Sequence, residues 1–296
     1  MEIRVLRYFL ALANAESISR AAEMLHVTQP TLSRQLMELE AQLGSKLFVR
    51  GSRKITLTAE GIFLRKRAEE ILALVDKTET EFNNPDEIIS GDIFIGGGET
   101  DAMRLIARAA KNLQTKYPHV HYNLFSGNAE DVTERLDNGL LDFGLLIGST
   151  DIKKYDFIRL PAVDTWGVLM LKDSPLALKT TISPEDLWDI PLICSRQTMV
   201  SNELTGWLRR DFAKLNIVAT YNLIYNASLM VEEGLGYALC LDKLINTSGH
   251  STLVFKPLEP NLQTVLNIVW KKHQVFSKAT DLFLKSVQAE FTSSKQ

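Results

Sequence analysis

Apolar side chains recur at helical spacing through the first part of the chain and predict three helices there. The first helix is expected over residues 3–15, and a short second helix follows Ser17, whose side chain can cap it. Thr28 offers a hydroxyl cap for the third helix, and Pro30 falls in its first turn, where a missing N–H costs little. The buried face of this third helix is predicted to hold Leu32, Leu36, Leu39 and Leu43.

After Gly44 the pattern changes to alternation, which predicts two short strands around a basic tip. The strands are Leu47–Val49 and Ile55–Leu57, and together with the residues between them they form a β-hairpin, here called the wing. The basic side chains of the wing would follow DNA phosphates or enter a narrow minor groove. They are Arg50, Arg53 and Lys54.

The face of the third helix opposite its leucines is small and polar, which suits the major groove of DNA. Gln29 and Arg34 can each contact a base edge with two hydrogen bonds, and Ser or Thr hydroxyls can reach phosphates or bases. The alternative is a packed three-helix unit without DNA contacts, but it gives the polar face and the wing arginines no purpose. The predicted DNA-contacting residues of this helix are Thr28, Gln29, Pro30, Thr31, Ser33 and Arg34.

A long helix is expected from the Thr58 cap to Phe82, followed by a hinge at Asn83–Asp86. Its apolar positions follow the spacing of a coiled-coil seam. Such a stripe can also pack on its own domain, but a second copy would place two reading helices on two half-sites of DNA. We therefore predict a dimer seam, which holds Leu64, Ala68, Ile71, Val75 and Phe82.

From Gly91 onward, strands alternate with helices, which predicts parallel sheet in an α/β arrangement. Both one large sheet and two smaller sheets fit this order. Strands are expected over 92–96, 120–125, 141–147, 167–171, 191–194, 219–224, 237–241 and 264–270, and helices over 100–117, 129–138, 202–215, 228–233 and 278–291.

Composition fits a soluble globular protein of two or three domains, with 45% hydrophobic and 23% charged residues. Residues 1–67 carry eleven Lys and Arg against six Asp and Glu (net +5), and the other 229 residues carry 22 against 30 (net −8). A basic end on an acidic chain favours a nucleic-acid-binding module, although chance alone can give such a difference.

Cysteine is scarce, and the two cysteines, Cys194 and Cys240, lie in apolar runs that predict reduced core residues, with a redox role left open. No apolar run is long enough to span a membrane, and the first residues do not follow the pattern of a signal peptide. We expect a cytoplasmic protein.

The first sixty-odd residues resemble the LysR-type transcriptional regulators. The motifs that carry the resemblance are Leu6–Phe9, Ala21-Ala22, Val27–Gln35, Leu39-Glu40, Leu43-Gly44, Leu47-Phe48 and Leu57–Gly61. The resemblance implies a multidomain α/β protein with an N-terminal winged helix-turn-helix, a long linker helix and an effector domain of two subdomains, like the periplasmic solute-binding proteins. It also implies DNA, a small-molecule inducer and further copies of the chain as partners, in a dimer or a dimer of dimers, and allows RNA polymerase as another.

The domains expected on this basis are a DNA-binding domain (1–60), a linker and dimerisation helix with its hinge (58–87), a first effector subdomain (91–160 plus 268–296) and a second (161–267). The chain would cross between the two subdomains near 158–166 and 261–268.

In open α/β sheets, ligands bind beyond the carboxyl ends of the strands. The loops at these ends are 97–100, 126–128, 147–149, 195–198 and 226–228. Several precede helices, so their free N–H groups could hold an anion, although a polar side chain there can equally serve only as a helix cap. The predicted inducer-contacting residues are Thr100, Asn128, Ser195, Arg196 and Asn226, and the expected ligand is a small, polar, anionic molecule.

No pattern predicts a catalytic site, a cofactor or a metal. Gly96–Gly98 lacks the spacing of a nucleotide loop, and His119 and His121 share a strand face without a third ligand at diagnostic spacing. A solute-binding protein and an enzyme on the same scaffold are the competing functions. The first does not explain 17–53, and the second lacks a catalytic constellation. We therefore expect a sequence-specific transcriptional regulator controlled by an inducer bound between the two subdomains, with activation and repression both left open.

Overall fold

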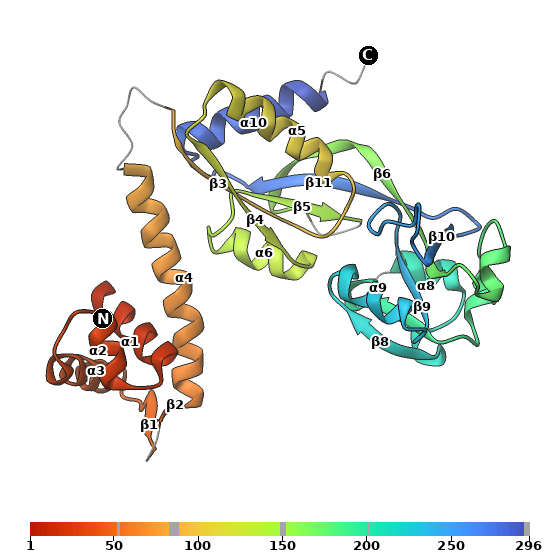
Figure 1. Cartoon of the computed structure of the whole chain (residues 1–296). Helices are drawn as coiled ribbons and strands as arrows, with labels where there is room; N and C mark the ends of the chain where they lie inside the picture. The colour runs from red at the N-terminus through yellow and green to blue at the C-terminus, as the bar shows by residue number, and fades with distance from the viewer. Residues whose placement is uncertain (52–53, 83–88, 149–151, 200–201, 293–296) are drawn as a thin grey trace. The chain divides into compact units, whose positions relative to one another are not determined.

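The computed structural model describes residues 1–51, 54–82, 89–148, 152–199 and 202–292 (Figure 1). The chain divides into two compact units, Met1–Asn83 and Asn84–Gln296. The predicted hinge at Asn83–Asp86 lies outside the described residues.

The first unit contains the three predicted helices, the wing and the long helix. Its elements are α1 (Ile3–Ala15), α2 (Ile18–Met24), α3 (Gln29–Leu43), β1 (Phe48–Arg50), β2 (Ile55–Leu57) and α4 (Ala59–Phe82). Thr28 and Thr58 cap α3 and α4 as predicted, since their hydroxyls accept the N–H groups of Thr31 and Gly61. Ser17 stands at the start of α2, but its side chain makes no capping hydrogen bond.

The core of this unit includes Phe9, Leu12, Leu32, Leu36 and Leu39, all almost fully buried. The prediction that Leu43 is also buried is wrong, because its side chain is 42% exposed. It is the last residue of α3, next to Gly44, which ends the helix in a left-handed conformation.

The first part of α4 packs on its own domain. Leu64, Ala68 and Leu72 are buried in the same core as α1, and Ile71 packs against its edge. The prediction that Leu64 and Ala68 form a dimer seam is therefore wrong, because their side chains are already covered within one chain. Val75 is half-buried, and the side chain of Phe82 lies outside the part of the chain that the structure describes.

The second unit is built on one nine-stranded mixed sheet flanked by helices. Its strands are β3 (Gly91–Gly97), β4 (Val120–Ser126), β5 (Phe143–Ile147), β6 (Tyr155–Leu171), β7 (Leu192–Ser195), β8 (Ile217–Tyr221), β9 (Tyr237–Leu241), β10 (Leu253–Pro257) and β11 (Gln263–Lys271). Its α-helices are α5 (Met103–Lys116), α6 (Ala129–Asp137), α7 (Arg196–Met199), α8 (Asn202–Leu208), α9 (Ile224–Glu232) and α10 (Lys278–Thr292), with 3-10 turns at Pro175–Leu178, Pro184–Leu187 and Phe212–Lys214.

The strands follow the order β4-β3-β5-β11-β6-β9-β7-β8, with β10 also paired to β6. Pairs within β3–β5 and within β7–β9 are parallel, as predicted, but every pair that includes β6 or β11 is antiparallel. The expectation of purely parallel sheet is therefore wrong. The sequence pattern also missed β10 and the first part of β6.

The strands β6 and β11 join two halves of this unit (Figure 1). The first part of β6 pairs with β11, from Tyr155↔Lys271 to Thr165↔Gln263, and its second part pairs with β9 and β10. One core surrounds Phe143 and Phe283, and separate clusters fill the other half. We call the part with β3–β5, α5, α6 and α10 the first half and the part with β7–β10 and α7–α9 the second half.

Candidate functional site

The start of α3 is capped and presents polar side chains to solvent. Thr28 accepts a hydrogen bond from the Thr31 N–H, and the two hydroxyls lie 2.8 Å apart. Thr28, Gln29, Pro30, Thr31 and Arg34 are exposed, and Ser33 is half-buried. The structure therefore places all six predicted residues at the cap of α3 or in its first two turns, and five of them are exposed.

Local polar contacts orient this face without burying it. Gln29 accepts a hydrogen bond from the Ser19 hydroxyl at 3.3 Å, which joins α2 to α3. The Arg34 side chain is 72% exposed and lies 3.6 Å from the Glu38 carboxylate one turn later. An exposed pair of this kind contributes little to stability, so the guanidinium can exchange it for a DNA contact.

The two strands of the wing pair antiparallel, with Phe48 opposite Leu57 and Arg50 opposite Ile55, and the first strand lies one residue later than predicted. Glu16 anchors the returning strand twice: its carbonyl accepts the Ile55 N–H, and its carboxylate lies 3.2 Å from the Lys54 ammonium. Arg53 and the side chain of Arg50 lie outside the described residues.

A buried carboxylate that the sequence analysis missed connects α3 to the wing. Glu40 is only 5% exposed and accepts hydrogen bonds from the Lys46 ammonium and the Leu47 N–H, both at 2.9 Å. Burial acts to raise the pKa of Glu40, but hydrogen bonds from Lys46 and from the backbone of Leu47 and Phe48 outweigh it and lower the pKa. Helical spacing could have indicated that Glu40 is buried, because it lies four residues after Leu36 and therefore on the buried face of α3.

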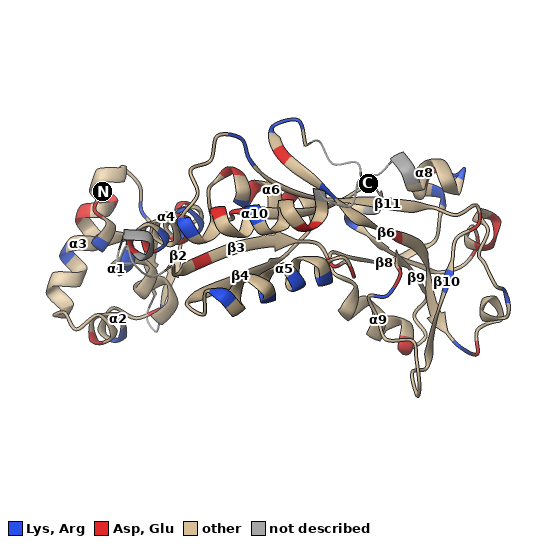
Figure 2. Ribbon diagram, turned by 90° about the horizontal axis from the view of Figure 1, so that it is seen from above, with Lys and Arg blue, Asp and Glu red and all other residues tan. Residues whose placement is uncertain are grey.

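Charge alone does not distinguish the predicted DNA-contacting face from the rest of the chain. Lys and Arg occur in both units (Figure 2), and α5 of the second unit carries four basic residues and no acidic one. The assignment of α3 and the wing therefore depends on geometry and polar side chains rather than on net charge.

In the second unit, loops at the carboxyl ends of the strands meet where the two halves join. The Gly127 N–H donates to the Gly97 carbonyl at 3.1 Å, within the first half. Across the halves, the Ala129 N–H donates to the Gln197 side-chain oxygen at 3.2 Å, and the Ile224 N–H donates to the Glu99 carboxylate. The predicted convergence of these loops is thus present in the structure, although Glu99 and Gln197, rather than their predicted neighbours Thr100 and Arg196, make the contacts.

Thr100 faces inward at this junction. Its hydroxyl donates to the Asp164 carboxylate at 2.5 Å and accepts the Ala102 N–H at 3.0 Å. Asp164, on β6, is 2% exposed. Burial raises the pKa of Asp164; the Thr100 hydrogen bond opposes this effect, and the nearby Asp242 carboxylate adds to it.

The other predicted inducer residues occupy different settings. Asn128 caps α6 in a reciprocal pair with Asp131, so the capping interpretation holds for this residue. Ser195 is half-buried at the end of β7, and Arg196 is exposed, with its Nε 3.5 Å from the Thr220 hydroxyl. Asn226 is exposed in the first turn of α9, so its predicted place in a loop is wrong: β8 ends and the helix begins earlier than the pattern indicated.

Both cysteines are buried and free. Cys194 packs with Leu239 on one face of the sheet and Cys240 packs with Ala238 on the other. Burial raises the pKa of each thiol to about 12, which keeps it protonated and unreactive at neutral pH.

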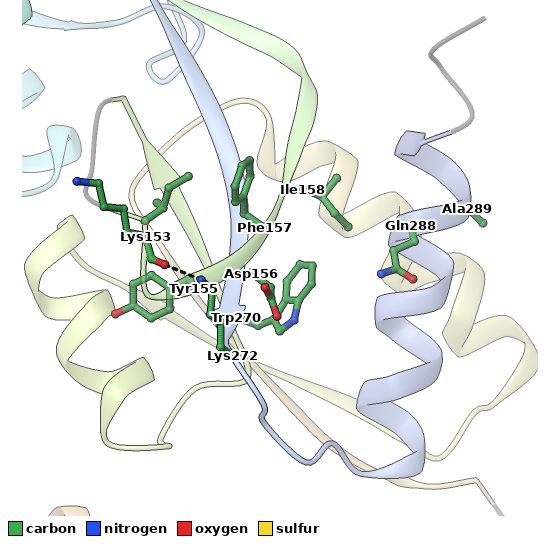
Figure 3. A pocket seen from close by; sticks show the side chains of 10 residues that line it. Lys153, Tyr155, Asp156, Phe157, Ile158, Trp270, Lys272, Gln288 and Ala289 are labelled. Atoms are coloured by element: carbon green, nitrogen blue, oxygen red, sulfur yellow. Dashed lines mark hydrogen bonds between the residues drawn. The ribbon is translucent and has the colours of Figure 1, made fainter.

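An open groove of about 1170 Å³ lies elsewhere on the first half (Figure 3). Phe157 and Ile158 of β6, Trp270 of β11 and Gln288 of α10 line it. Ile158 precedes Asp164 by six residues, or about 20 Å along an extended strand, so this groove is separate from the junction loops.

His119 and His121 are exposed, and the described ranges contain no cluster of three or more potential metal-binding side chains. In those same ranges, no helix has both the length and the apolar character needed to cross a membrane.

Each of the two units matches its own protein-family model. Residues 3–62 match the family model "Bacterial regulatory helix-turn-helix protein, lysR family", and residues 87–292 match "LysR substrate binding domain". The Hca operon transcriptional activator HcaR of Escherichia coli (strain K12) is 30% identical over 99% of both chains, and the regulator BsdA of Bacillus subtilis (strain 168) is 31% identical over 73% of this chain and 74% of its own.

Among solved structures, full-length CbnR complexed with its target DNA shares the fold, with a TM-score of 0.76, 20% identity and coverage of 98% of this chain and 99% of that one. The family models together span nearly all of the described residues. The chain therefore belongs to the LysR family of DNA-binding transcriptional regulators.

Proposed function

We propose that the exposed start of α3 reads base edges in the major groove of a specific operator. The observation that carries this proposal is the capped helix end, which presents Gln29 and Arg34 to solvent with only weak side-chain partners. Arg is suited to a two-hydrogen-bond contact with guanine and Gln to one with adenine. Thr28, Thr31 and Ser33 would add hydroxyl contacts, and Pro30 would shape the approach to the groove.

The wing supplies sequence-independent attraction in this proposal. Arg50, Arg53 and Lys54 would contact phosphates or the minor groove. The ion pair between Lys54 and Glu16 is exposed, so the ammonium can leave it for a phosphate at little cost.

Two copies of the chain would bind two half-sites. With Leu64 and Ala68 buried in their own domain, the dimer seam that we propose is the later part of α4, from Ile71 through Val75 to Phe82. Assembly as a dimer or a dimer of dimers, a contact with RNA polymerase and a cytoplasmic location complete this proposal.

The second unit would bind the inducer where the junction loops meet, near Thr100, Asn128, Ser195, Arg196 and Asn226. A ligand that contacts both halves favours one arrangement of them, and it shifts the equilibrium only by its difference in affinity for the arrangements. The regulator would thereby change its affinity for DNA or its contacts with polymerase, without any catalytic step.

A gel-shift titration of the full chain tests the DNA-binding part of the proposal. The probes are the intergenic DNA next to its gene and a random duplex of equal length. We expect tighter binding to the intergenic DNA, and Arg34→Ala should reduce this preference by about 1–3 kcal/mol, the value of one good base contact.

The matched control is Arg104→Ala, which removes an exposed arginine with a nearby helical ion pair in the other unit. It should leave both affinities unchanged. Equal loss on both duplexes with Arg34→Ala would reassign Arg34 to the DNA backbone, and no preference in the parent protein would refute the proposed specificity.

A further inference from the structure

The start of α9 is occupied by a carboxylate from the other half of the second unit. Ile224 is the first residue of α9, and its N–H donates to the Glu99 carboxylate. The preceding residue, Leu223, has no side-chain oxygen and makes no capping hydrogen bond. Glu99 lies in the loop after β3, 125 residues away in sequence, so it takes the place that a local capping residue normally fills.

A second contact runs in the opposite direction between the halves. The Gln197 side chain, from the second half, accepts the N–H of Ala129 at the start of α6 in the first half. Each half thus supplies an oxygen to a helix start of the other. Both contacts therefore link the two halves at the junction.

The Glu99 carboxylate itself opposes the entry of a second carboxylate. It accepts the N–H of Ile224, so a free anion at the start of α9 would meet it at close range. Like charges at close range repel.

We propose that Glu99 is a built-in occupant of the inducer site, and that an inducer bearing a carboxylate reaches the start of α9 only by displacing it. This inference rests on the proposed binding of an inducer at the junction. Displacement breaks the contact between Glu99 and Ile224, so ligand binding is coupled to the loss of one hydrogen bond between the halves.

The occupancy of the helix start sets the size of the effect. If Glu99 fills it about nine-tenths of the time, a ligand finds about one-tenth of the molecules competent, and its apparent affinity falls about tenfold. Removal of the Glu99 side chain should therefore raise the apparent affinity of the ligand by the same factor.

The test uses the full chain and acetate, the simplest carboxylate, as the probe. Thermal unfolding midpoints of the parent, Glu99→Ala and Asp101→Ala are measured in sodium acetate and in sodium chloride of equal ionic strength. The rise of the midpoint with acetate concentration gives an apparent dissociation constant. Asp101→Ala is the matched control, because it removes another acidic residue from the same loop. The Asp101 carboxylate pairs with Arg104 inside its own half rather than with α9.

We expect the apparent dissociation constant of acetate to be about tenfold lower for Glu99→Ala than for the parent and for Asp101→Ala. Hydrogen exchange over residues 222–228 should be faster in Glu99→Ala, and acetate should slow it again. Equal acetate response in all three proteins, or unchanged exchange at the start of α9, would overturn the proposal.

Glu99→Gln keeps an oxygen that can accept the Ile224 N–H but removes the charge. It should respond to acetate between the parent and Glu99→Ala, and it serves as the test if Glu99→Ala does not fold. None of these readouts uses DNA, so a failure here leaves the gel-shift result untouched. Loss of operator preference would refute the proposed regulation while leaving the acetate result in place.

Discussion

Glu40 offers a sharp test of how the recognition helix and the wing are joined. In Glu40→Ala, the buried Leu47 N–H loses its acceptor, which costs about 1–3 kcal/mol. The contact with Lys46 adds at most about 1 kcal/mol, because the Lys46 side chain is 77% exposed. We therefore expect the wing to lose about 1–4 kcal/mol of local stability.

Hydrogen exchange followed by mass spectrometry is the suitable assay, because all four tryptophans lie in the second unit and their fluorescence does not report on the first. Exchange over residues 46–58 should accelerate roughly 5- to 700-fold in Glu40→Ala, since each factor of ten corresponds to about 1.4 kcal/mol. Glu40→Gln keeps an acceptor for the Leu47 N–H and should lose about 1–2 kcal/mol, the difference between charged and neutral hydrogen bonds.

The pH dependence of this effect has a fixed sign. The pKa of Glu40 is lowered from its ordinary value of 4.5 in the folded chain, so its carboxylate stabilises the wing above that value. The difference between the parent and Glu40→Gln should therefore be constant near neutral pH and shrink as the pH falls through the lowered pKa. The control is Glu38→Ala, which removes an exposed acid two residues earlier. Exchange within threefold of the parent in both Glu40 variants would show that Glu40 does not hold the wing.

Three further outcomes follow from the same structure. Arg53→Ala and Lys54→Ala should each reduce the salt slope of log K for DNA by about 0.9; an unchanged slope and affinity in filter binding would remove that residue from the phosphate contacts. Val75→Asp should convert dimers into folded monomers, because an unpaired charge in an apolar seam is costly, and light scattering that still shows dimers would exclude this position from the seam. Asp164→Asn should gain thermal stability relative to the parent as the pH rises from 3.8 through the raised pKa of Asp164, because the parent must then ionise a buried carboxyl; a constant difference across that range would contradict the assignment.

The helices and the wing of the first unit could be predicted because their signals are local. Helix spacing, the Thr28 and Thr58 caps and the alternation around the wing all lie within a few residues of the element that they define. Glu40 was missed, although its spacing placed it on the buried face. The apolar stripe of α4 fits a dimer seam and a domain core equally well, and only the structure shows that α1 covers Leu64 and Ala68.

The second unit was harder to predict because its key strand pairs and side-chain contacts join residues that are distant in sequence. The first part of β6 carries exposed Asp156, Arg159 and Pro161, so it reads as a linker until β11, about a hundred residues later, supplies its partner. Sequence reasoning located the junction loops by the rule for strand ends. It could not identify Glu99 and Gln197, because each partner is a backbone N–H in the other half and leaves no mark in the local pattern.

The paired strands β6 and β11 also determine how the two halves can move. They form a continuous hydrogen-bonded ribbon between the halves, so a wide swing about a flexible loop would break backbone hydrogen bonds. A two-stranded ribbon twists far more readily than it breaks, and the register shift between Val265 and Asn267 is where extra twist can concentrate. The pairing of β6 with β11 therefore favours a twist of one half against the other over a wide swing.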